Sequence, residues 1–408
     1  MSAHLKMDTP DHRRRLDHTA QGVIGTGLNR PDGAAKVTGT APYAYEVQPE
    51  NMAYGVLVRA PVTRGTLTGI DADAVMALPG VLSVMHGPKF LRNPAQGTAN
   101  TAPVQGSEDI AYWGQPVALV IAETFEQARH GAHLLELQIA AKTGQVDPEA
   151  AGFETPDDQQ DSQGDLDQAM QDAAASVDVT YTTPGHNSAA MEPHASIASW
   201  DGAHLTLRGS YQMPNYNINE LASSVGIDAA QVRILSPFVG GGFGAKLGIA
   251  PEAVAAALAA MELSRPVGVA LSRQQVFETT MRRSESRQRV RLSADAQGHL
   301  TGIGHEAYVS NLPDEAFSEP VTQATPFIYS GENRLIGHHI ARVNRTCAGS
   351  VRAPGESIGV TVLENAMDEL ACDLGIDPVD LRLANFPDKN PTSGLPFSSH
   401  KLAEALTI

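Results

Sequence analysis

Cysteine is scarce in this chain, with only Cys347 and Cys372 among 408 residues. Two thiols cannot form a disulfide framework, a four-cysteine zinc site or an iron–sulfur cluster, so these three kinds of site are excluded. We expect both thiols to be buried, in a protein of a reducing compartment.

The sequence also lacks a surplus of positive charge. It has 29 lysine and arginine residues against 46 acidic residues, a formal net charge of −17 at pH 7. A nucleic-acid partner requires a basic surface, so this class of partner is excluded.

Long apolar runs are absent as well, since none approaches the roughly 20 residues of a membrane-spanning helix. We therefore expect no membrane partner. Three arginines at 13–15 are followed by polar residues rather than an apolar segment, so they do not form an export signal. We expect a cytoplasmic protein, or a periplasmic one if it is exported together with a signal-bearing partner.

The remaining pattern predicts an α/β protein of at least two domains, because single cores stop growing at roughly 250–300 residues. Residues 1–21 are polar and predict a flexible arm. Residues 22–142 predict a first domain and 165–408 a second, which we expect to be incomplete at its C-terminal end. The segment 143–164 between them contains glycine, proline and many acidic residues, and predicts a linker.

Short apolar runs predict buried strands at 116–122 and 232–235, and alternation predicts one at 205–207. Thr124 and Gln127 form a capping box that begins a helix. Pro251 begins an alanine-rich helix that we expect to be buried.

Further along, two runs at 287–292 and 300–308 predict a hairpin. A helix with one apolar face ends at Gly375, and the Asp-Pro pair at 377–378 begins the next helix. The apolar face consists of Val360, Leu363, Met367, Leu370 and Leu374. An amphipathic helix is predicted at 400–408.

The sharpest local feature is the stretch 240–246, Gly-Gly-Gly-Phe-Gly-Ala-Lys. Four glycines around one phenylalanine let backbone N–H groups approach a ligand without obstruction by Cβ atoms. Such a loop can hold an anion or a metal-bound oxygen. The spacing fits neither a P-loop nor a dinucleotide-binding fingerprint. A ligand-binding loop and a tight structural turn both remain open.

Three other segments carry polar groups. The Met-Glu-Pro-His segment at 191–194 is a poor metal site by itself, and a hydrogen-bonded pair that holds a bend is the better interpretation. Arg352 precedes a Pro-Gly turn and suits anion recognition, with a plain surface turn as the alternative. The arginines between 282 and 291 predict a solvated face or a subunit contact, and those at 287, 289 and 291 would share one side of a strand.

In their order along the chain, these segments resemble the molybdopterin-binding subunit of the xanthine dehydrogenase and aldehyde oxidoreductase family. The likeness is greatest to the large subunit of three-subunit bacterial aldehyde oxidoreductases and runs from about residue 22 to the end. The motifs lie at 30–33 with 36–39 and 43–46, at 115–118 with 122–124, at 191–194, at 240–244, at 352–356, and at 368–370 with 377–378, Arg382 and Asn385.

This resemblance implies an α/β-hammerhead-like domain followed by the first of two molybdenum-cofactor-binding domains, the second lying beyond residue 408. In the family, the dithiolene of a pterin holds the molybdenum, which transfers a water-derived hydroxyl to a carbon and takes two electrons. The cytosine dinucleotide is one form that the molybdopterin could take. Because the chain has no cysteines for a cluster, we expect separate iron–sulfur and FAD subunits as partners.

The motif match implies cofactor contacts but no protein ligand to the metal. Position 186 is usually Gln in the family, and the histidine here can still donate one hydrogen bond. Glu192 would be a structural residue below the cofactor. The catalytic base of the family is a Glu that lies beyond residue 408, so no catalytic residue is assigned and the chain alone is expected to be inactive. The implied cofactor-binding residues are Gly241, Gly242, Phe243, Gly244, Arg352 and His186.

Leu247 bears on the substrate, because purine-hydroxylating members carry a Glu at this position and an Arg near 320 that this chain lacks. The resemblance therefore favours a small apolar or aromatic aldehyde, oxidised to its carboxylic acid. Two alternatives remain: a non-catalytic scaffold without cofactor, and a purine or xanthine dehydrogenase subunit. Molybdenum content distinguishes the first, and turnover of aldehyde against xanthine distinguishes the second.

Overall fold

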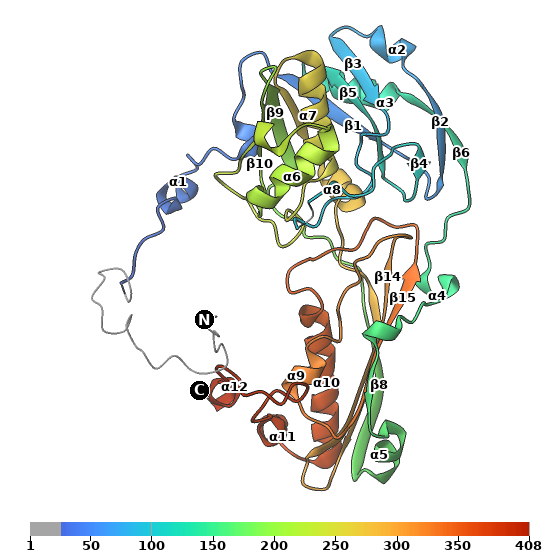
Figure 1. Cartoon of the computed structure of the whole chain (residues 1–408), viewed down its shortest axis with the longest axis vertical. Coiled ribbons are helices and arrows are strands. Elements are labelled where there is room, and N and C mark those ends of the chain that lie inside the picture. Colours follow the sequence, from blue (N-terminus) through green and yellow to red (C-terminus); the bar gives the residue numbers. More distant parts are fainter. Residues whose placement is uncertain (1–25, 99, 408) are drawn as a thin grey trace, which may run out of the picture.

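The computed structural model describes residues 26–98 and 100–407. The predicted arm at 1–21 lies outside these residues. The chain forms two α/β lobes, drawn one above the other in Figure 1. A seven-stranded and a three-stranded sheet form the upper lobe, and a five-stranded sheet with a long helix forms the lower lobe.

The seven-stranded sheet combines strands from both predicted domains. Strand β1 pairs in parallel with β12, with Ala53 opposite Val267, and pairs on its other side with β5. The two predicted domains therefore contribute strands to one continuous sheet. The domain boundary at 143–164 remains a prediction. In sheet order the strands are β11 (Val232–Leu235), β10 (Leu205–Gly209), β9 (Ala195–Trp200), β12 (Val267–Ala270), β1 (Ala53–Arg59), β5 (Pro116–Ala122) and β3 (Val81–His86).

Three sequence predictions for this sheet are confirmed. The runs at 116–122 and 232–235 form β5 and β11, and the alternating stretch at 205–207 lies in β10. Every residue of β5 is buried, which explains why its sequence is continuously apolar.

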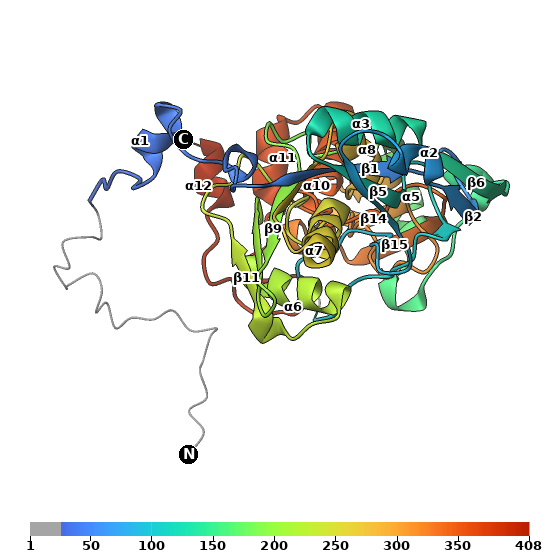
Figure 2. The same ribbon diagram turned by 90° about the horizontal axis from the view of Figure 1, so that it is seen from above.

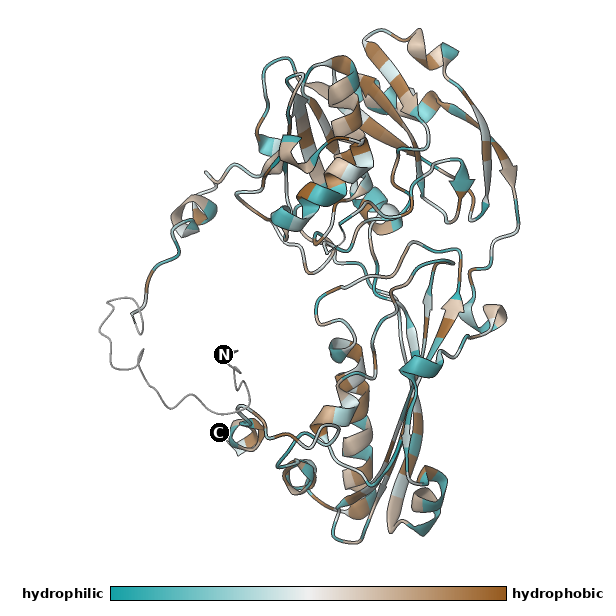
Figure 3. Ribbon diagram, in the orientation of Figure 1, coloured by the Kyte–Doolittle hydropathy of each residue, from teal (hydrophilic) through white to brown (hydrophobic). Residues whose placement is uncertain are grey.

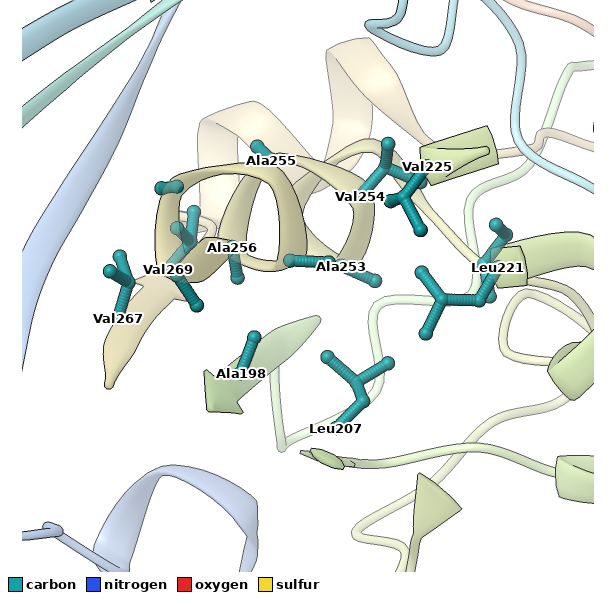
Figure 4. Packing of buried hydrophobic residues seen from close by; sticks show 14 of the residues in the cluster. Ala198, Leu207, Leu221, Val225, Ala253, Val254, Ala255, Ala256, Val267 and Val269 are labelled. Atoms are coloured by element: carbon teal, nitrogen blue, oxygen red, sulfur yellow. The ribbon is translucent and has the colours of Figure 1, made fainter. Parts of the chain in front are cut away.

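Small side chains let one helix lie close against the sheet. Helix α7 (Pro251–Leu263) begins at Pro251 as predicted, and its alanines are buried. In Figure 4, Ala253 and Ala256 of this helix lie next to Ala198 and Leu207 of the sheet. Close packing of this kind fixes the chain on both sides of the glycine stretch, which lies between β11 and α7.

The remaining helices of the upper lobe flank the same sheet. Thr124 begins α3, and its capping box with Gln127 is confirmed. A smaller sheet consists of β4 (Asp109–Ile110), β2 (Gly65–Asp71) and β6 (Glu136–Ala141). The other elements here are α2 (Asp73–Met76), α3 (Phe125–Leu134), α6 (Pro214–Val225), η3 (Ala229–Gln231) and α8 (Arg273–Thr279).

The lower lobe packs a five-stranded sheet against α10 (Glu356–Leu374). The predicted hairpin is the antiparallel pair β13–β14, and the apolar face of α10 packs on the sheet. Helix α10 ends at Gly375 with φ +67°, and Asp377 caps the next helix, α11 (Pro378–Asn385), both as predicted. Figure 3 shows hydrophobic residues along α10 and on the central strands of the upper lobe. The strands are β7 (Asp161–Gln163), β15 (Asn333–Arg342), β14 (Leu300–Asn311), β13 (Ser286–Ala294) and β8 (Ala175–Thr183).

Regular secondary structure occurs within the segment 143–164, which the sequence predicts as a linker. It contains α4 (Pro148–Ala151), η2 (Asp157–Gln159) and β7, and β7 pairs antiparallel with β15. Its acidic side chains face solvent while its backbone extends the sheet, as suits an edge strand. Asp161 also forms an ion pair with Arg334 at 2.8 Å.

Helix α1 (Gly33–Val37) projects from the upper lobe in Figures 1 and 2, and its Lys36 ammonium lies 5.9 Å from the ring centroid of Phe238, which follows β11. The predicted C-terminal helix is α12 (Leu402–Thr407). Within the described residues, no helix combines the length and the hydrophobicity needed to cross a membrane. The last short elements are η1 (Ala44–Glu46), α5 (Leu166–Asp172), α9 (Thr325–Ile328) and α11 (Pro378–Asn385).

The two cysteines differ in exposure. Cys347 is buried as expected, but Cys372 is exposed, which corrects the expectation for that thiol. The buried stripe of α10 passes through Leu370 and Ala371, so the next position points outward.

Candidate functional site

The stretch 240–246, here called the glycine loop, has three residues in the left-handed region of backbone space. Gly241, Phe243 and Gly244 have φ angles of +102°, +52° and +96°. The N–H groups of Gly241, Gly242 and Phe243 have no acceptor among the residues that the structure describes. Three successive free N–H groups can together receive an anion or another electron-rich atom.

The glycines are also required by packing. A Cβ atom on Gly240 would lie 2.5 Å from the Cβ of Glu192, and one on Gly244 would overlap the main-chain oxygen of Ser350. A Cβ on Gly242 would overlap the side-chain amide of Gln212. The loop is therefore a tight structural turn that also presents free donors, so the two interpretations are compatible.

Glu192 and Lys246 anchor the loop from below. Glu192 accepts a hydrogen bond of 2.7 Å from the N–H of Gly240. The Lys246 ammonium donates to the Glu192 main-chain oxygen at 2.9 Å, to its carboxylate at 3.2 Å and to the Ser210 hydroxyl at 3.1 Å. Burial lowers the pKa of Lys246, and the Glu192 carboxylate opposes this shift. Glu192 is thus a structural residue, as the resemblance implies.

His194 fixes the far end of the same loop. Its Nε2 lies 3.0 Å from the main-chain oxygen of Ala245, and burial lowers its pKa to about 4. The neutral ring therefore donates to this oxygen. The segment at 191–194 holds a bend, as predicted, but through separate bonds from Glu192 and His194 to the loop.

Gln212 is a site residue that the sequence analysis missed. Its side-chain oxygen accepts from the N–H of Gly244 at 3.0 Å and from that of Lys246 at 3.3 Å. A single Gln in a polar segment after β10 gave no signal of this role.

A buried acidic group lies behind the loop, at the start of α7. Glu252 is 2% exposed, and the Ser196 hydroxyl donates to one of its oxygens at 3.2 Å. Its other oxygen has no hydrogen-bond partner among the described residues. Burial raises the pKa of Glu252 to about 7.

Arg352 lies beside the glycine loop at the surface. Its N–H donates to the main-chain oxygen of Phe243 at 2.7 Å, which joins the two segments. Its guanidinium is exposed and has no ion-pair or hydrogen-bond partner within the described part of the chain. Such a group is available to an anionic ligand.

His186 reaches the same region through the backbone of Arg283. The two residues exchange hydrogen bonds of 3.2 and 2.8 Å between their N–H and C=O groups. The His186 side chain is exposed. The structure thus connects the segments that carry His186, Phe243 and Arg352.

The basic run between 282 and 291 divides into two parts. Arg287, Arg289 and Arg291 share one side of β13 and pair with acidic residues. Arg287 and Arg289 are partly exposed, as predicted for a solvated face, but Arg291 is buried. Arg282 and Arg283 are buried as well, so the prediction is corrected for these three arginines. Arg282 and Arg283 precede β13, and the carboxylates of Glu285 and Glu319 compensate their charge.

A cavity of about 930 Å³ lies beside the glycine loop. Its walls are largely apolar and include the side chains of Tyr43, Tyr45, Met191 and Phe243. The ring of Phe243 is partly exposed in this wall. A small apolar or aromatic molecule would fit these walls.

Two family models match this chain. A family model described as the molybdopterin cofactor-binding domain matches residues 152–386. A second model, the a/b hammerhead domain of aldehyde oxidase and xanthine dehydrogenase, matches residues 38–142.

The aldehyde oxidoreductase molybdenum-binding subunit of Escherichia coli (strain K12) is 40% identical over 409 residues, covering 98% of this chain and 55% of that protein. The nicotine 6-hydroxylase large subunit of Paenarthrobacter nicotinovorans is 28% identical, over 90% of this chain and 49% of that protein. The chain thus spans about half the length of these curated relatives. The nicotinate dehydrogenase large molybdopterin subunit of Eubacterium barkeri, 25% identical, is matched over 89% of both chains.

Solved structures share the fold. Aldehyde oxidoreductase from Desulfovibrio gigas superposes with a TM-score of 0.82 at 24% identity, over 93% of this chain and 45% of that chain. Quinoline 2-oxidoreductase from Pseudomonas putida 86 gives 0.84 at 20% identity, over 94% and 53%. The chain therefore has a hammerhead domain followed by a molybdenum-cofactor-binding domain, and it belongs to the xanthine dehydrogenase and aldehyde oxidoreductase family of molybdopterin-binding proteins.

Proposed function

We propose that this chain supplies the pterin-binding part of a molybdenum hydroxylase that oxidises aldehydes to carboxylic acids. The observation that carries the proposal is the row of free N–H groups at Gly241, Gly242 and Phe243, next to the unpaired guanidinium of Arg352. Donors and a cation at one place suit an anionic, oxygen-rich group.

The residues present fit the molybdenum–pterin group of the family. The glycines leave the loop backbone open to a ligand, while Glu192, Gln212 and Lys246 hold it in place from the other side. When bound, that group would supply the transfer of a water-derived hydroxyl and accept two electrons. We assign Gly241, Gly242, Phe243 and Gly244 to its contacts through the backbone.

Arg352 and His186 complete the proposed set of contacts. Arg352 would neutralise anionic charge on the pterin or its nucleotide, and His186 would donate one hydrogen bond. The cytosine dinucleotide form is our choice for the molybdopterin. Acid release of the nucleotide from the loaded enzyme would identify it, and a guanine or absent nucleotide would contradict that choice.

The substrate that we propose is an aromatic aldehyde. The walls of the cavity beside Phe243 are largely apolar. The family resemblance implies an acidic residue in purine-hydroxylating members at the position where this chain has Leu247. The Escherichia coli relative, at 40% identity, is named an aldehyde oxidoreductase. Iron–sulfur and FAD subunits would receive the electrons, since two cysteines in this chain cannot hold a cluster. We propose the cytoplasm as its compartment, or the periplasm if such a partner carries an export signal; cell fractionation would decide.

The decisive experiment is to purify the complete complex that contains this chain and to measure its molybdenum content and turnover. We expect about one molybdenum per complex, and benzaldehyde oxidation faster than xanthine oxidation. A complex without molybdenum would support the scaffold alternative, and preferential xanthine turnover would support the purine alternative. The 408-residue chain alone should not oxidise benzaldehyde, and turnover by the isolated chain would refute this expectation of inactivity.

A further inference from the structure

A buried ion pair lies behind the turn that carries Arg352. Arg283 is 3% exposed and Glu319 is fully buried, and their side chains are 2.5 Å apart. Neither residue belongs to a motif that identified the family.

The guanidinium of Arg283 binds the backbone of this turn directly. It donates to three successive main-chain oxygens, those of Val351, Arg352 and Ala353, the first at 3.2 Å and the last at 3.3 Å. Glu319 in turn accepts a hydrogen bond of 2.7 Å from the N–H of Gly355. One pair of side chains therefore fixes the turn on both sides of Pro354.

The same pair connects to the other proposed contacts of the cofactor. The backbone of Arg283 is paired with His186, and the N–H of Arg352 donates to the main-chain oxygen of Phe243. The glycine loop, the Arg352 turn and the His186 segment thus converge on Arg283.

Backbone conformation suggests that the turn needs such support. Ala353 and Phe243 both have φ +52°, in the left-handed region of backbone space that residues other than glycine rarely adopt. Conformations of this kind persist only where surrounding contacts enforce them. Arg283 bonds to the oxygen of Ala353 itself, and the oxygen of Phe243 is held by the turn.

We infer that Arg283 and Glu319 are positioning residues that set the Arg352 turn, and through it the Phe243 loop, in the geometry that the cofactor requires. This inference rests on the proposed function. A buried ion pair is weak support for stability, because an apolar pair of similar volume is often as stable. What an apolar pair cannot provide is three hydrogen bonds to consecutive carbonyl groups from one planar group.

The test compares two variants with a matched control, all in the complete molybdenum-loaded complex. Arg283→Lys keeps the positive charge but loses the planar guanidinium group that donates several hydrogen bonds at once. The double variant Arg283→Met with Glu319→Leu removes both charges together. Arg282→Lys is the control, because Arg282 is buried beside Arg283 and pairs with Glu285, but its guanidinium does not contact the Arg352 turn.

Three readouts apply to each protein: amide hydrogen exchange at Arg352 in the cofactor-free complex, the EPR spectrum of the Mo(V) state, and kcat and KM measured separately. We expect both Arg283 variants to exchange the Arg352 amide faster, to change the Mo(V) spectrum and to lose about 10²-fold in kcat with little change in KM. Arg282→Lys should match the wild type in all three.

Wild-type exchange, spectrum and kcat in both Arg283 variants would overturn the inference. So would failure of both variants to fold while Arg282→Lys folds, because the pair would then be a folding element. The proposed function is judged on the wild-type complex alone: if that holds no molybdenum, the function fails, whatever the exchange data show.

Discussion

The ammonium group of Lys246 lies 2.9 Å from the main-chain oxygen of Glu192 and 3.2 Å from its carboxylate. This contact joins the segment at 191–194 to the glycine loop, and the Glu192 carboxylate also accepts a hydrogen bond from the N–H of Gly240. The carboxylate and the ammonium thus close the loop at both ends from beneath. The free N–H groups at its top depend on this arrangement below.

Replacing Lys246 with Met should destabilise the protein strongly. The variant removes one partner of a buried pair and leaves the Glu192 carboxylate without its cation, which typically costs about 3–5 kcal/mol. The free energy of unfolding, measured with urea, tests this. Lys401→Met provides the control, because Lys401 is exposed in its ion pair with Glu404 and should change stability little. Equal effects of the two variants would show that the Lys246 contact is not an anchor.

Gly244→Ala should prevent cofactor binding by deforming the loop. Its φ of +96° is unfavourable for alanine, and the added Cβ would overlap the main-chain oxygen of Ser350. Gly202→Ala is a matched control, because Gly202 has φ +94° but open space around it. That control should lose roughly 1–2 kcal/mol of stability from the backbone alone and keep its molybdenum. Normal molybdenum content in Gly244→Ala would contradict the loop's proposed role.

Local patterns in the sequence predicted local structure well. The apolar run at 116–122, the proline at 251 and the glycine at 375 each mark an element boundary or a buried strand where the structure has one. Pairing between distant segments could not be predicted in this way. The parallel contact of Ala53 with Val267 joins strands more than two hundred positions apart and depends on how the whole chain folds.

The candidate site was predictable only in part, for the same reason. The glycine loop can be recognised in the sequence because its residues have little steric restriction. The side chains that hold the loop and the adjoining turn in place belong to other segments of the chain. Gln212, Arg283 and Glu319 act through single side chains aimed at backbone groups. Neither hydrophobic period nor local spacing marks such contacts, so only the structure identifies them.

Glu252→Gln should stabilise the protein at alkaline pH. In the unfolded chain this carboxyl group loses its proton near pH 4.5, whereas burial in the folded protein raises its pKa to about 7. The wild type therefore loses stability as the pH rises from 4.5 to 7, by up to about 3 kcal/mol, and no more above that. The neutral variant avoids this loss, so its advantage should be present at pH 8 and nearly absent at pH 4.5.

Urea unfolding at both pH values measures this difference. Glu262→Gln, at an exposed position of the same helix α7, is the control and should show no such pH-dependent gain. A Glu252 variant that is less stable than the wild type at pH 8 would mean that the carboxylate is ionised and compensated in the folded protein.

Arg352→Gln should weaken the binding of the anionic group without changing the stability of the protein. The guanidinium is exposed and has no partner among the described residues, so its loss should leave the free energy of unfolding unchanged. If it binds an anionic group, the variant loses a charged hydrogen bond of roughly 1.5–3 kcal/mol, which lowers kcat/KM or cofactor retention by about 10- to 100-fold. Arg233→Gln, an exposed arginine on β11, should leave both quantities unchanged. Equal turnover and molybdenum retention in the two variants would remove Arg352 from the site, and the proposed anion-binding donors would then be the free N–H groups of the glycine loop and His186.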